Sequence, residues 1–219
     1  MKALVTGGTG RVGAAIAARL RAEGHHVLAA GRADGDLGNV DSARALVARA
    51  AAELGGLELL VHAASAGFEA KAVADVTEAD WDTALGATAK GAFFTAQAAA
   101  PHLRTSGGTI VMIDDVAAYR PWPSFAPHCA AKAAQAMLTR VLARALAPEV
   151  RVCGVTPGPV AVAADQVERR AGETVLGRVG SPEDVAAAVL FLAGADFVTG
   201  STLVVDGGLL LQSGRLANA

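Results

Sequence analysis

The stretch Lys2-Ala-Leu-Val-Thr-Gly-Gly-Thr-Gly-Arg-Val-Gly13 decides the fold of this chain. Its apolar opening predicts a buried strand, and the apolar pattern that follows predicts a helix. Between the two, Gly7, Gly10 and Gly13 have GxxGxxG spacing. Such a turn lets backbone approach a pyrophosphate at a helix N-terminus. The stretch therefore predicts a nucleotide site, and the alternative is a tight turn that needs glycine only for its φ angles.

Strands and helices alternate along the rest of the chain. The predicted strands are Lys2–Thr6, His26–Ala30, Leu57–His62, Gly108–Ile113, Arg151–Val155 and Thr202–Val205. The predicted helices are Val12–Glu23, Asp41–Leu54 with Asp41 as N-cap, Asp80–Leu103 as one helix or two, Ala126–Ala147, and Ser181–Ala193 with Ser181 as N-cap. Alternation of this kind requires parallel strands with helices on both faces. We expect one α/β domain over residues 1–219, a doubly wound parallel sheet of about seven strands that includes the substrate pocket.

Composition narrows the functional classes. The chain has 219 residues and a formal charge of −2, so no basic field favours nucleic acid as a partner. It contains neither an apolar run of about 18 residues nor a polybasic cluster, so we expect no membrane association. The N-terminus predicts a strand rather than a signal peptide. Because Cys129 and Cys153 lack metal-site or CxxC spacing, we expect reduced thiols, no metal site and a cytoplasmic location.

The end of the second predicted strand bears on which nucleotide binds. An NAD site needs an acid there to accept a hydrogen bond from the ribose 2′-hydroxyl, and Gly31 stands in that place. Arg32 can instead pair with a 2′-phosphate as a planar donor, helped by Arg11 in the glycine turn. Asp34 and Asp36 are acidic competitors, and the alternative for Arg32 is a solvated surface residue. We predict NADPH as the cofactor.

A second set of motifs lies further along the chain. The helix from Ala126 carries His128-Cys-Ala-Ala-Lys132, and Asp115 stands at a strand end thirteen residues before the histidine. Together with the glycine turn, Pro157-Gly158 and Val205-Asp206-Gly207-Gly208, this layout resembles the short-chain dehydrogenase/reductase family over nearly the whole chain. The resemblance implies a Rossmann-type fold, a nicotinamide cofactor and a small-molecule substrate. In that family the helix carries YxxxK and the strand end usually carries serine.

The resemblance also implies which residues bind the cofactor. Asp36-Leu37 matches the family's adenine-contacting acid, and His62-Ala63-Ala64-Ser65 stands where the family has NNAG. Lys132 would bind the nicotinamide ribose, and Pro157-Gly158 matches the turn beside the nicotinamide. The implied cofactor-binding set is Thr6, Gly7, Gly10, Arg11, Val12, Gly13, Arg32, Asp36, Leu37, Ala63, Ala64, Ser65, Lys132, Pro157, Gly158 and Val160.

Within the family, the chain is most similar to pteridine reductases. These enzymes carry arginine within the glycine turn as TGxxxRxG and a serine after the strand that is fourth in the family. They also carry aspartate in place of the family's catalytic serine, followed by arginine-proline. The residues of this chain that match are Thr6, Gly7, Arg11, Gly13, Ser65, Asp115, Arg120 and Pro121. Pteridine reductases prefer NADPH. The similarity implies reduction of a carbonyl or imine in a small, flat, cyclic substrate such as a pteridine.

Four positions carry the chemistry in the wider family: asparagine, serine, tyrosine and lysine. Here they become Thr88, Asp115, His128 and Lys132. Histidine can act as a general acid because its side chain titrates near neutral pH, and Asp115 can pair with the ring and fix its tautomer. Tyr119, the only tyrosine, is an alternative proton donor on the loop after Asp115. We therefore predict an atypical reductase site.

Several alternatives stay open at this stage. His128 can simply fill the space of the missing tyrosine, and Lys132 can be a solvated helix lysine. Trp122, Phe125 and Phe68 either line a flat apolar pocket or pack as ordinary loop residues. The chain can also be a redox-silent lyase, isomerase or cyclase that uses the same histidine and Asp115, or a non-catalytic nucleotide-binding subunit.

Assembly follows from the resemblance. In the family, two long central helices pair across two-fold axes. The matching predicted helices here, Asp80–Leu103 and Ala126–Ala147, are rich in alanine, which allows backbones to approach closely. We expect a homotetramer, with a homodimer as the alternative.

Overall fold

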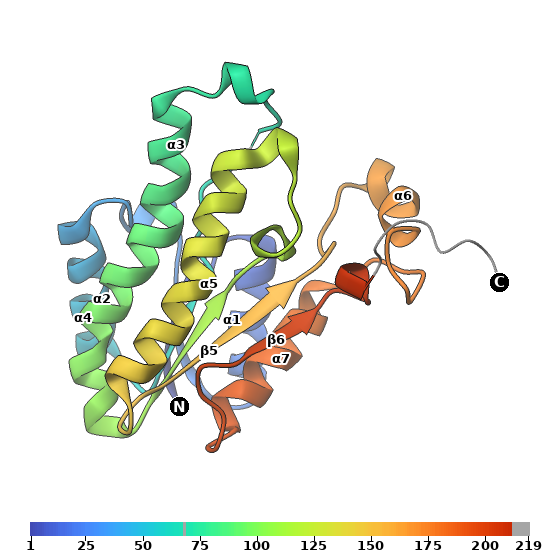
Figure 1. Ribbon diagram of the computed structural model, residues 1–219. Coiled ribbons are helices and arrows are strands. Elements are labelled where there is room, and N and C mark those ends of the chain that lie inside the picture. The colour runs from blue at the N-terminus through green and yellow to red at the C-terminus, as the bar shows by residue number, and fades with distance from the viewer. Residues whose placement is uncertain (68, 212–219) are drawn as a thin grey trace.

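The computed structural model describes residues 1–67 and 69–211. Its centre is a parallel sheet of six strands in the order β2-β1-β3-β4-β5-β6, with helices on both faces (Figure 1). The strands are β1 (Lys2–Thr6), β2 (His26–Ala30), β3 (Leu59–His62), β4 (Thr109–Ile113), β5 (Arg151–Pro157) and β6 (Thr202–Val205). The predicted doubly wound α/β fold is therefore confirmed.

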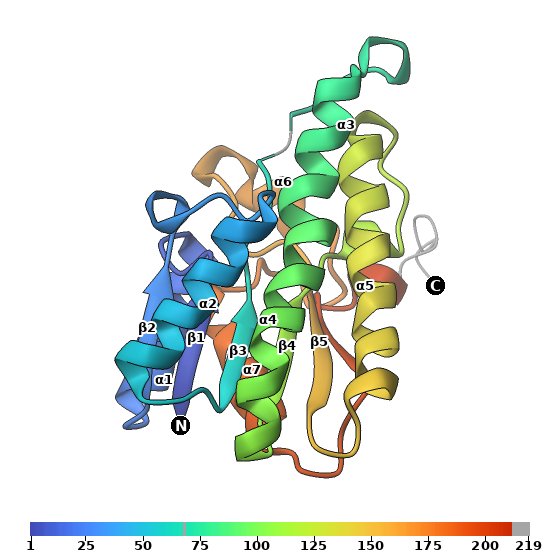
Figure 2. The same ribbon diagram turned by 90° about the vertical axis from the view of Figure 1, so that its left-hand side faces the viewer.

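Each face of the sheet has its own layer of helices and its own hydrophobic core. The helices α1 (Arg11–Ala22) and α7 (Pro182–Gly194) cover one face. The other face is covered by α2 (Val40–Leu54), α4 (Gly91–Ser106) and α5 (Ala126–Leu146), which lie in front of the strands in Figure 2. Two cores on opposite faces are what a parallel sheet with crossover helices requires.

The central strand β4 contributes side chains to both hydrophobic cores. Ile110 and Met112 belong to the core under α2, α4 and α5, whereas Val111 and Ile113 belong to the core under α1 and α7. Successive side chains of a strand point to opposite faces, so a strand that is buried on both sides must be apolar throughout. The continuous apolar run that predicted this strand is the direct consequence.

The sheet has six strands rather than the expected seven or so, and the difference lies beside β2. Only nine residues, 31–39, connect β2 to α2. A parallel strand needs a crossover of about a dozen residues or more, so this connection is too short to hold another strand and its helix. β2 is therefore an edge strand. Arg21 donates a hydrogen bond to the Val27 carbonyl at 3.0 Å, which occupies one backbone acceptor of that edge.

The helix boundaries agree with the prediction in most places and differ in two. The stretch predicted as one helix or two is α3 (Glu78–Leu85) followed by a π turn over Gly86–Lys90 and then α4. The N-cap of α2 is Asn39, not Asp41, because the Asn39 side chain accepts from the backbone N–H of residues 41 and 42. Ser181 caps α7 as predicted, in a capping box with Asp184.

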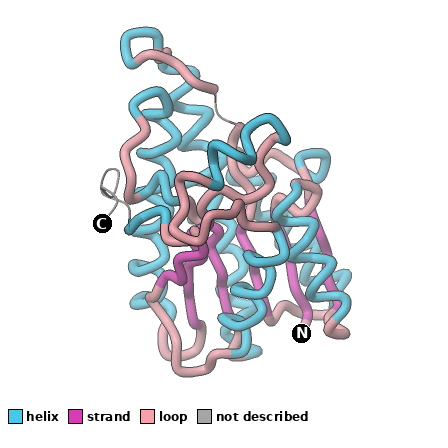
Figure 3. The backbone as a smooth tube through the Cα atoms, turned by 90° about the vertical axis from the view of Figure 1, so that its right-hand side faces the viewer, coloured by secondary structure: helices cyan, strands magenta, loops and turns pink. Residues whose placement is uncertain are grey.

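The strands are parallel, so their carboxyl ends meet at one end of the sheet. Figure 3 shows the loops gathered there. The glycine turn after β1 and the loop after β4 lie at this end, and the short helix α6 (Val167–Ala171) projects beyond β5 (Figure 1). Ligands of doubly wound sheets bind in this place. Within the described part of the chain, no helix is long and apolar enough to cross a membrane.

Candidate active site

The glycine turn after β1 brings backbone atoms closer together than side chains would allow. Gly7 has a φ of 66°, and a Cβ on it would lie 2.5 Å from the Ala63 carbonyl oxygen. A Cβ on Gly13 would lie 2.2 Å from the Gly7 carbonyl oxygen, so α1 can begin against the turn only without a side chain there. Both glycines are therefore required by packing alone.

Gly10 has a different part in the same turn. It is the N-cap of α1, and a Cβ on it would meet only the Gly7 oxygen, at 3.3 Å. No side chain caps the first turn of α1. The first N–H groups of a helix have no intrahelical acceptor and favour a bound anion. The uncapped N-terminus of α1 therefore fits a phosphate group.

A cleft of about 310 Å³ lies beside this turn. The residues that were predicted to bind cofactor and that line it are Thr6, Gly7, Gly10, Arg32, Asp36, Leu37, Ala63, Ala64 and Ser65. Gly31 and Thr9 line it as well, and a Cβ at position 31 would lie 2.4 Å from the Thr9 Oγ1. The glycine after β2 is thus needed for packing against the turn, which sequence reasoning did not find. The cleft and the uncapped helix together fit a nucleotide with a pyrophosphate.

The charged side chains beside the cleft differ in their hydrogen bonds and ion pairs within the protein. The Asp34 carboxylate accepts from Arg49 at 2.6 Å and from the Gly31 N–H at 2.8 Å, and these bonds lower the pKa of Asp34. The Asp36 carboxylate accepts from the Gly38 N–H at 2.9 Å. The Arg32 guanidinium makes no hydrogen bond or ion pair within the described residues, and Arg32 lines this cleft and two adjoining cavities.

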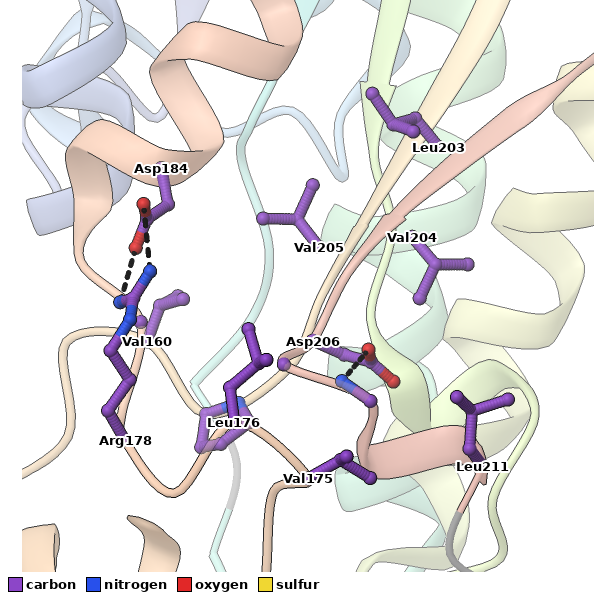
Figure 4. Close-up of a pocket in the computed structure, with 14 residues that line it drawn as sticks. Val160, Val175, Leu176, Arg178, Asp184, Leu203, Val204, Val205, Asp206 and Leu211 are labelled. Atoms are coloured by element: carbon purple, nitrogen blue, oxygen red, sulfur yellow. Dashed lines mark hydrogen bonds and ion pairs between the residues drawn. The ribbon is translucent and has the colours of Figure 1, made fainter.

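Lys132 is described below, and the other predicted cofactor residues lie in three places. Arg11 and Val12 form the first turn of α1. Gly158, after β5, donates to the Val205 carbonyl at 2.9 Å. Val160 lines a separate cavity of about 470 Å³ between the segment that follows β5 and the strand β6. Figure 4 shows this second cavity, with the Arg178–Asp184 ion pair at one side and apolar side chains from β6 at the other. Its described lining contains none of the predicted catalytic residues.

His128 and Asp115 face each other at the carboxyl end of β4. The His128 Nε2 lies 3.4 Å from the Asp115 Oδ2. The other oxygen of Asp115 accepts from the Ala117 N–H at 2.8 Å, which fixes the carboxylate at the start of a short turn. His128 lies in the first turn of α5 and is 4% exposed. The predicted couple of a carboxylate and an imidazole is therefore present.

Trp122, from the loop before α5, and Arg170, from α6, form a stack beside the His128 imidazole. The Trp122 indole stacks on the His128 ring, with centroids 6.5 Å apart and planes inclined by 14°. The Arg170 guanidinium of α6 lies over the Trp122 ring, 5.8 Å from its centroid. Aromatic and cation–π contacts at these distances are favourable. Sequence reasoning missed Arg170, because nothing in a segment so far along the chain indicates that it meets Trp122.

His128 lines a cavity of about 490 Å³ that also reaches Arg32. Phe125 lines it, which is one of the two alternatives for that side chain, and Phe68 lies outside the described residues. The walls are more polar than the expected flat apolar pocket. Lys71 and Asp80 form an ion pair there at 2.6 Å, which lowers the pKa of Asp80 and raises that of Lys71.

Lys132 lies one helical turn beyond His128 and is 5% exposed, so it is not a solvated helix lysine. Its Nζ donates to the Ile113 carbonyl at 2.8 Å and to the Gln135 Oε1 at 3.2 Å. Burial lowers the pKa of Lys132, and the charges of Asp115 and Asp114 act against that effect. The structure thus places the buried Lys132 in one cluster with Asp115, whose side chain is 25% exposed.

Two predicted catalytic residues lie apart from this cluster. Thr88 is buried in the π turn, where its hydroxyl lies 3.2 Å from the Ser65 hydroxyl and accepts from the Ala66 N–H at 3.4 Å. It supports the loop after β3. Tyr119 is 46% exposed and does not line any of the cavities described above. The described residues contain no group of His, Cys, Asp and Glu side chains that could hold a metal ion.

Known proteins are similar to this chain over most of its length. The family described as enoyl-(acyl carrier protein) reductase matches residues 18–210. Dehydrogenase/reductase SDR family member 4 of Homo sapiens is 32% identical in an alignment over 239 residues, gaps included. The alignment covers 94% of this chain and 86% of that protein. The 4-formylbenzenesulfonate dehydrogenase of Comamonas testosteroni is 36% identical over 242 residues, with 94% and 96% covered. The ligand-free aldohexose dehydrogenase of Thermoplasma acidophilum has the same fold, with a TM-score of 0.93, 24% identity, and 99% and 96% covered.

Proposed function

The chain belongs to the short-chain dehydrogenase/reductase family, and from this premise we propose that it is an NADPH-dependent reductase in which His128 is the proton donor. Membership makes it an oxidoreductase that uses a nicotinamide cofactor and a small-molecule substrate. The observation that carries the finer proposal is the 3.4 Å contact between the His128 Nε2 and the Asp115 Oδ2, beside a cavity that also reaches Arg32.

The residues at the glycine turn would hold the nucleotide. The uncapped N-terminus of α1 would bind the pyrophosphate, and Lys132 would bind the nicotinamide ribose. Arg32 would bind the 2′-phosphate, because it is the cation at the cleft and makes no described bond, while Asp34 and Asp36 are engaged elsewhere. When bound, the nucleotide supplies a hydride. This arrangement supports NADPH over NADH.

His128 would supply the proton that reduction also requires. In its doubly protonated form the ring can pass one proton to the oxygen or nitrogen of the substrate that receives the negative charge. The Asp115 carboxylate would stabilise the charged ring and keep it oriented, and the Trp122 stack would limit its rotation. A contact of 3.4 Å is longer than a strong hydrogen bond, so the pair has room to tighten around a bound substrate.

We propose a small, flat, cyclic carbonyl or imine as the substrate. Phe125 at the cavity and Trp122 on the histidine offer aromatic surface. The pteridine-reductase-like residues Asp115 and Arg120-Pro121 support the same class. The relative from Comamonas testosteroni acts on 4-formylbenzenesulfonate, which is a planar ring with a carbonyl group. A dihydropterin and a quinone are therefore the first substrates to test.

The test compares three variants with the wild type in NADPH consumption and NADPH binding. His128→Phe should bind NADPH normally and lose about 10²–10⁴-fold in turnover, the usual scale for one acid catalyst. His128→Tyr rebuilds YxxxK and should keep or gain reduction of a dihydropterin or quinone. Tyr119→Phe is the matched control, because it removes the hydroxyl of the other candidate proton donor, and it should leave turnover unchanged. Unchanged turnover in His128→Phe would refute the assignment, and loss of turnover in Tyr119→Phe would then make Tyr119 the donor.

A redox-silent activity is the second candidate, and the same pair of residues favours it. A carboxylate in contact with an imidazole is an acid–base couple that can serve a lyase, isomerase or cyclase without any hydride. Product formation with no NADPH consumption would support this alternative over reduction. Binding of NADPH without turnover of any tested substrate would instead support a non-catalytic nucleotide-binding subunit.

We also propose a homotetramer, with a homodimer as the alternative, of single-domain subunits. The outer side of α5 exposes Met137 by 54% and Val141 by 49%, which supports helix pairing between copies. A cytoplasmic location is supported by the two free cysteines, Cys129 and Cys153. Light scattering at micromolar concentration tests the assembly, and a monomer would refute it.

A further inference from the structure

Asp114 is a buried carboxyl group that the proposed mechanism does not use. It follows β4 directly, and its backbone N–H donates to the Val155 carbonyl at 2.8 Å. The residue is 3% exposed. Neither of its carboxylate oxygens has a hydrogen-bond partner within the described residues. A buried carboxylate without partners is strongly unfavourable, so such a group either binds a proton or depends on a nearby counter-charge.

The space for this carboxyl group is left by a glycine on the neighbouring strand. A Cβ on Gly154 of β5 would lie 2.7 Å from the Asp114 Oδ2. The same point lies 2.7 Å from the Thr202 Oγ1 of β6. Neither neighbour carries a charge. The neighbouring strands β5 and β6 therefore leave room for the Asp114 carboxyl group but supply no charge to neutralise it.

The charged groups that act on Asp114 come from α5 and from the segment that follows β4. Burial raises the pKa of Asp114 to about 7, while the Lys132 charge lowers it and the adjacent Asp115 raises it. His62, at the end of β3, also feels the Lys132 charge. Burial and that charge lower the pKa of His62 to about 3, so its ring is neutral near pH 7. Lys132 is thus the cation that acts on Asp114.

The hydrogen bonds of Lys132 also indicate that Asp114 is the carboxylate whose charge balances it. Its Nζ donates only to neutral oxygens in the described contacts, those of Ile113 and Gln135. Asp115 is held by the Ala117 N–H and by the His128 ring. Asp114 has no such bonds, so its protonation can change without breaking any described hydrogen bond.

We propose that Asp114 is a positioning residue for Lys132, sharing a buried proton equilibrium with it so that the lysine stays charged where the nucleotide ribose is held. The inference rests on the proposed function in taking Lys132 as the ribose-binding residue. Asp114 carries a proton at low pH and releases it as the pH rises. Its carboxylate then retains the charge of Lys132 into more alkaline solution.

The first experiment measures NADPH affinity against pH in the wild type and in Asp114→Asn. Loss of the carboxylate lowers the pKa of Lys132, so the alkaline midpoint of NADPH binding should fall by about one pH unit. Thr139→Val is the matched control, because Thr139 is a buried residue of α5 whose side-chain oxygen, like those of Asp114, has no described partner. It removes no charge and should leave the midpoint in place. An unmoved midpoint in Asp114→Asn would overturn the inference.

The second experiment needs no nucleotide. Infrared spectra of the free protein across pH should contain a protonated-carboxyl band that titrates near neutral pH and is absent from Asp114→Asn. In Lys132→Met the same band should persist to a higher pH by about one unit, because the lysine charge lowers the pKa of Asp114. Absence of the band, or the same midpoint in Lys132→Met, would overturn the inference. If the wild type binds no NADPH at any pH, the proposed function fails, and the infrared result alone decides whether Asp114 and Lys132 share the proton.

Discussion

The buried carboxyl of Asp114 leads to a prediction about stability against pH, tested with Asp114→Asn. The pKa of Asp114 is about 7 in the folded protein, against an ordinary value of 3.8. Because the folded-state pKa is raised, folding favours the protonated form. The stability that comes from this proton is complete below the ordinary value and is lost as the pH rises through about 7.

The magnitude follows from the size of the shift. About three units of pKa at about 1.4 kcal/mol each give roughly 4 kcal/mol of unfolding free energy lost between about pH 4 and pH 8. Asparagine has the same shape and does not titrate in this range. The unfolding free energy of Asp114→Asn minus that of the wild type should therefore grow by roughly 4 kcal/mol over the same interval.

The assay is urea unfolding followed by tryptophan fluorescence at several values of pH. The difference between the two proteins is the relevant quantity, since it cancels the titration of the groups on which the Asp114 charge does not act. The buried amide in the variant has its own desolvation cost, but that cost does not change with pH. A difference that stays constant from about pH 4 to pH 8 would refute the reasoning, because it would mean that Asp114 titrates normally in the folded protein.

Three further predictions concern the nucleotide site and assembly. Arg32→Ala should weaken NADPH binding roughly tenfold to a hundredfold in calorimetry and leave NADH unchanged, with the exposed Arg44→Ala as control; equal losses for both nucleotides would contradict the 2′-phosphate role. Gly13→Ala normally adds about 1 kcal/mol of helix stability, yet here it should destabilise by about 1–3 kcal/mol in urea unfolding, because its Cβ would lie 2.2 Å from the Gly7 oxygen. Light scattering should give the mass of a tetramer or dimer, and concentration-independent monomers would contradict the assembly.

Local patterns were sufficient to predict most of the fold. The strand, glycine turn and helix at the N-terminus are specified by neighbouring residues, so the sequence indicated both their order and their place. The sheet has six strands against the expected seven or so, because the short connection after Ala30 leaves no room for a further crossover. Helix starts were less certain, since Asn39 and Asp41 are equally good caps two residues apart.

The site was predictable where residues follow strand ends and not where distant segments meet. Asp115 and His128 come together because α5 is the helix that follows β4 along the chain and covers it, which the spacing of the two motifs indicates. The contact of Arg170 with Trp122 depends on how the loop after β5 folds back, and no local signal encodes it. The burial of Asp114 could have been predicted from the sequence. Two acids directly follow an apolar strand, and successive side chains of a strand point to opposite faces, so one of the two must be buried or bend away.

The central claim is that hydride transfer occurs at this site and that His128 supplies the proton. Single-turnover reduction of a dihydropterin, whose ring carbon retains the transferred hydride, tests both parts at once when both C4 positions of the NADPH nicotinamide carry deuterium. The account predicts one deuterium in each product molecule with wild-type protein, and a rate about 10²–10⁴-fold lower in His128→Phe with NADPH binding retained. Product without deuterium, or an unchanged rate in His128→Phe, would contradict it.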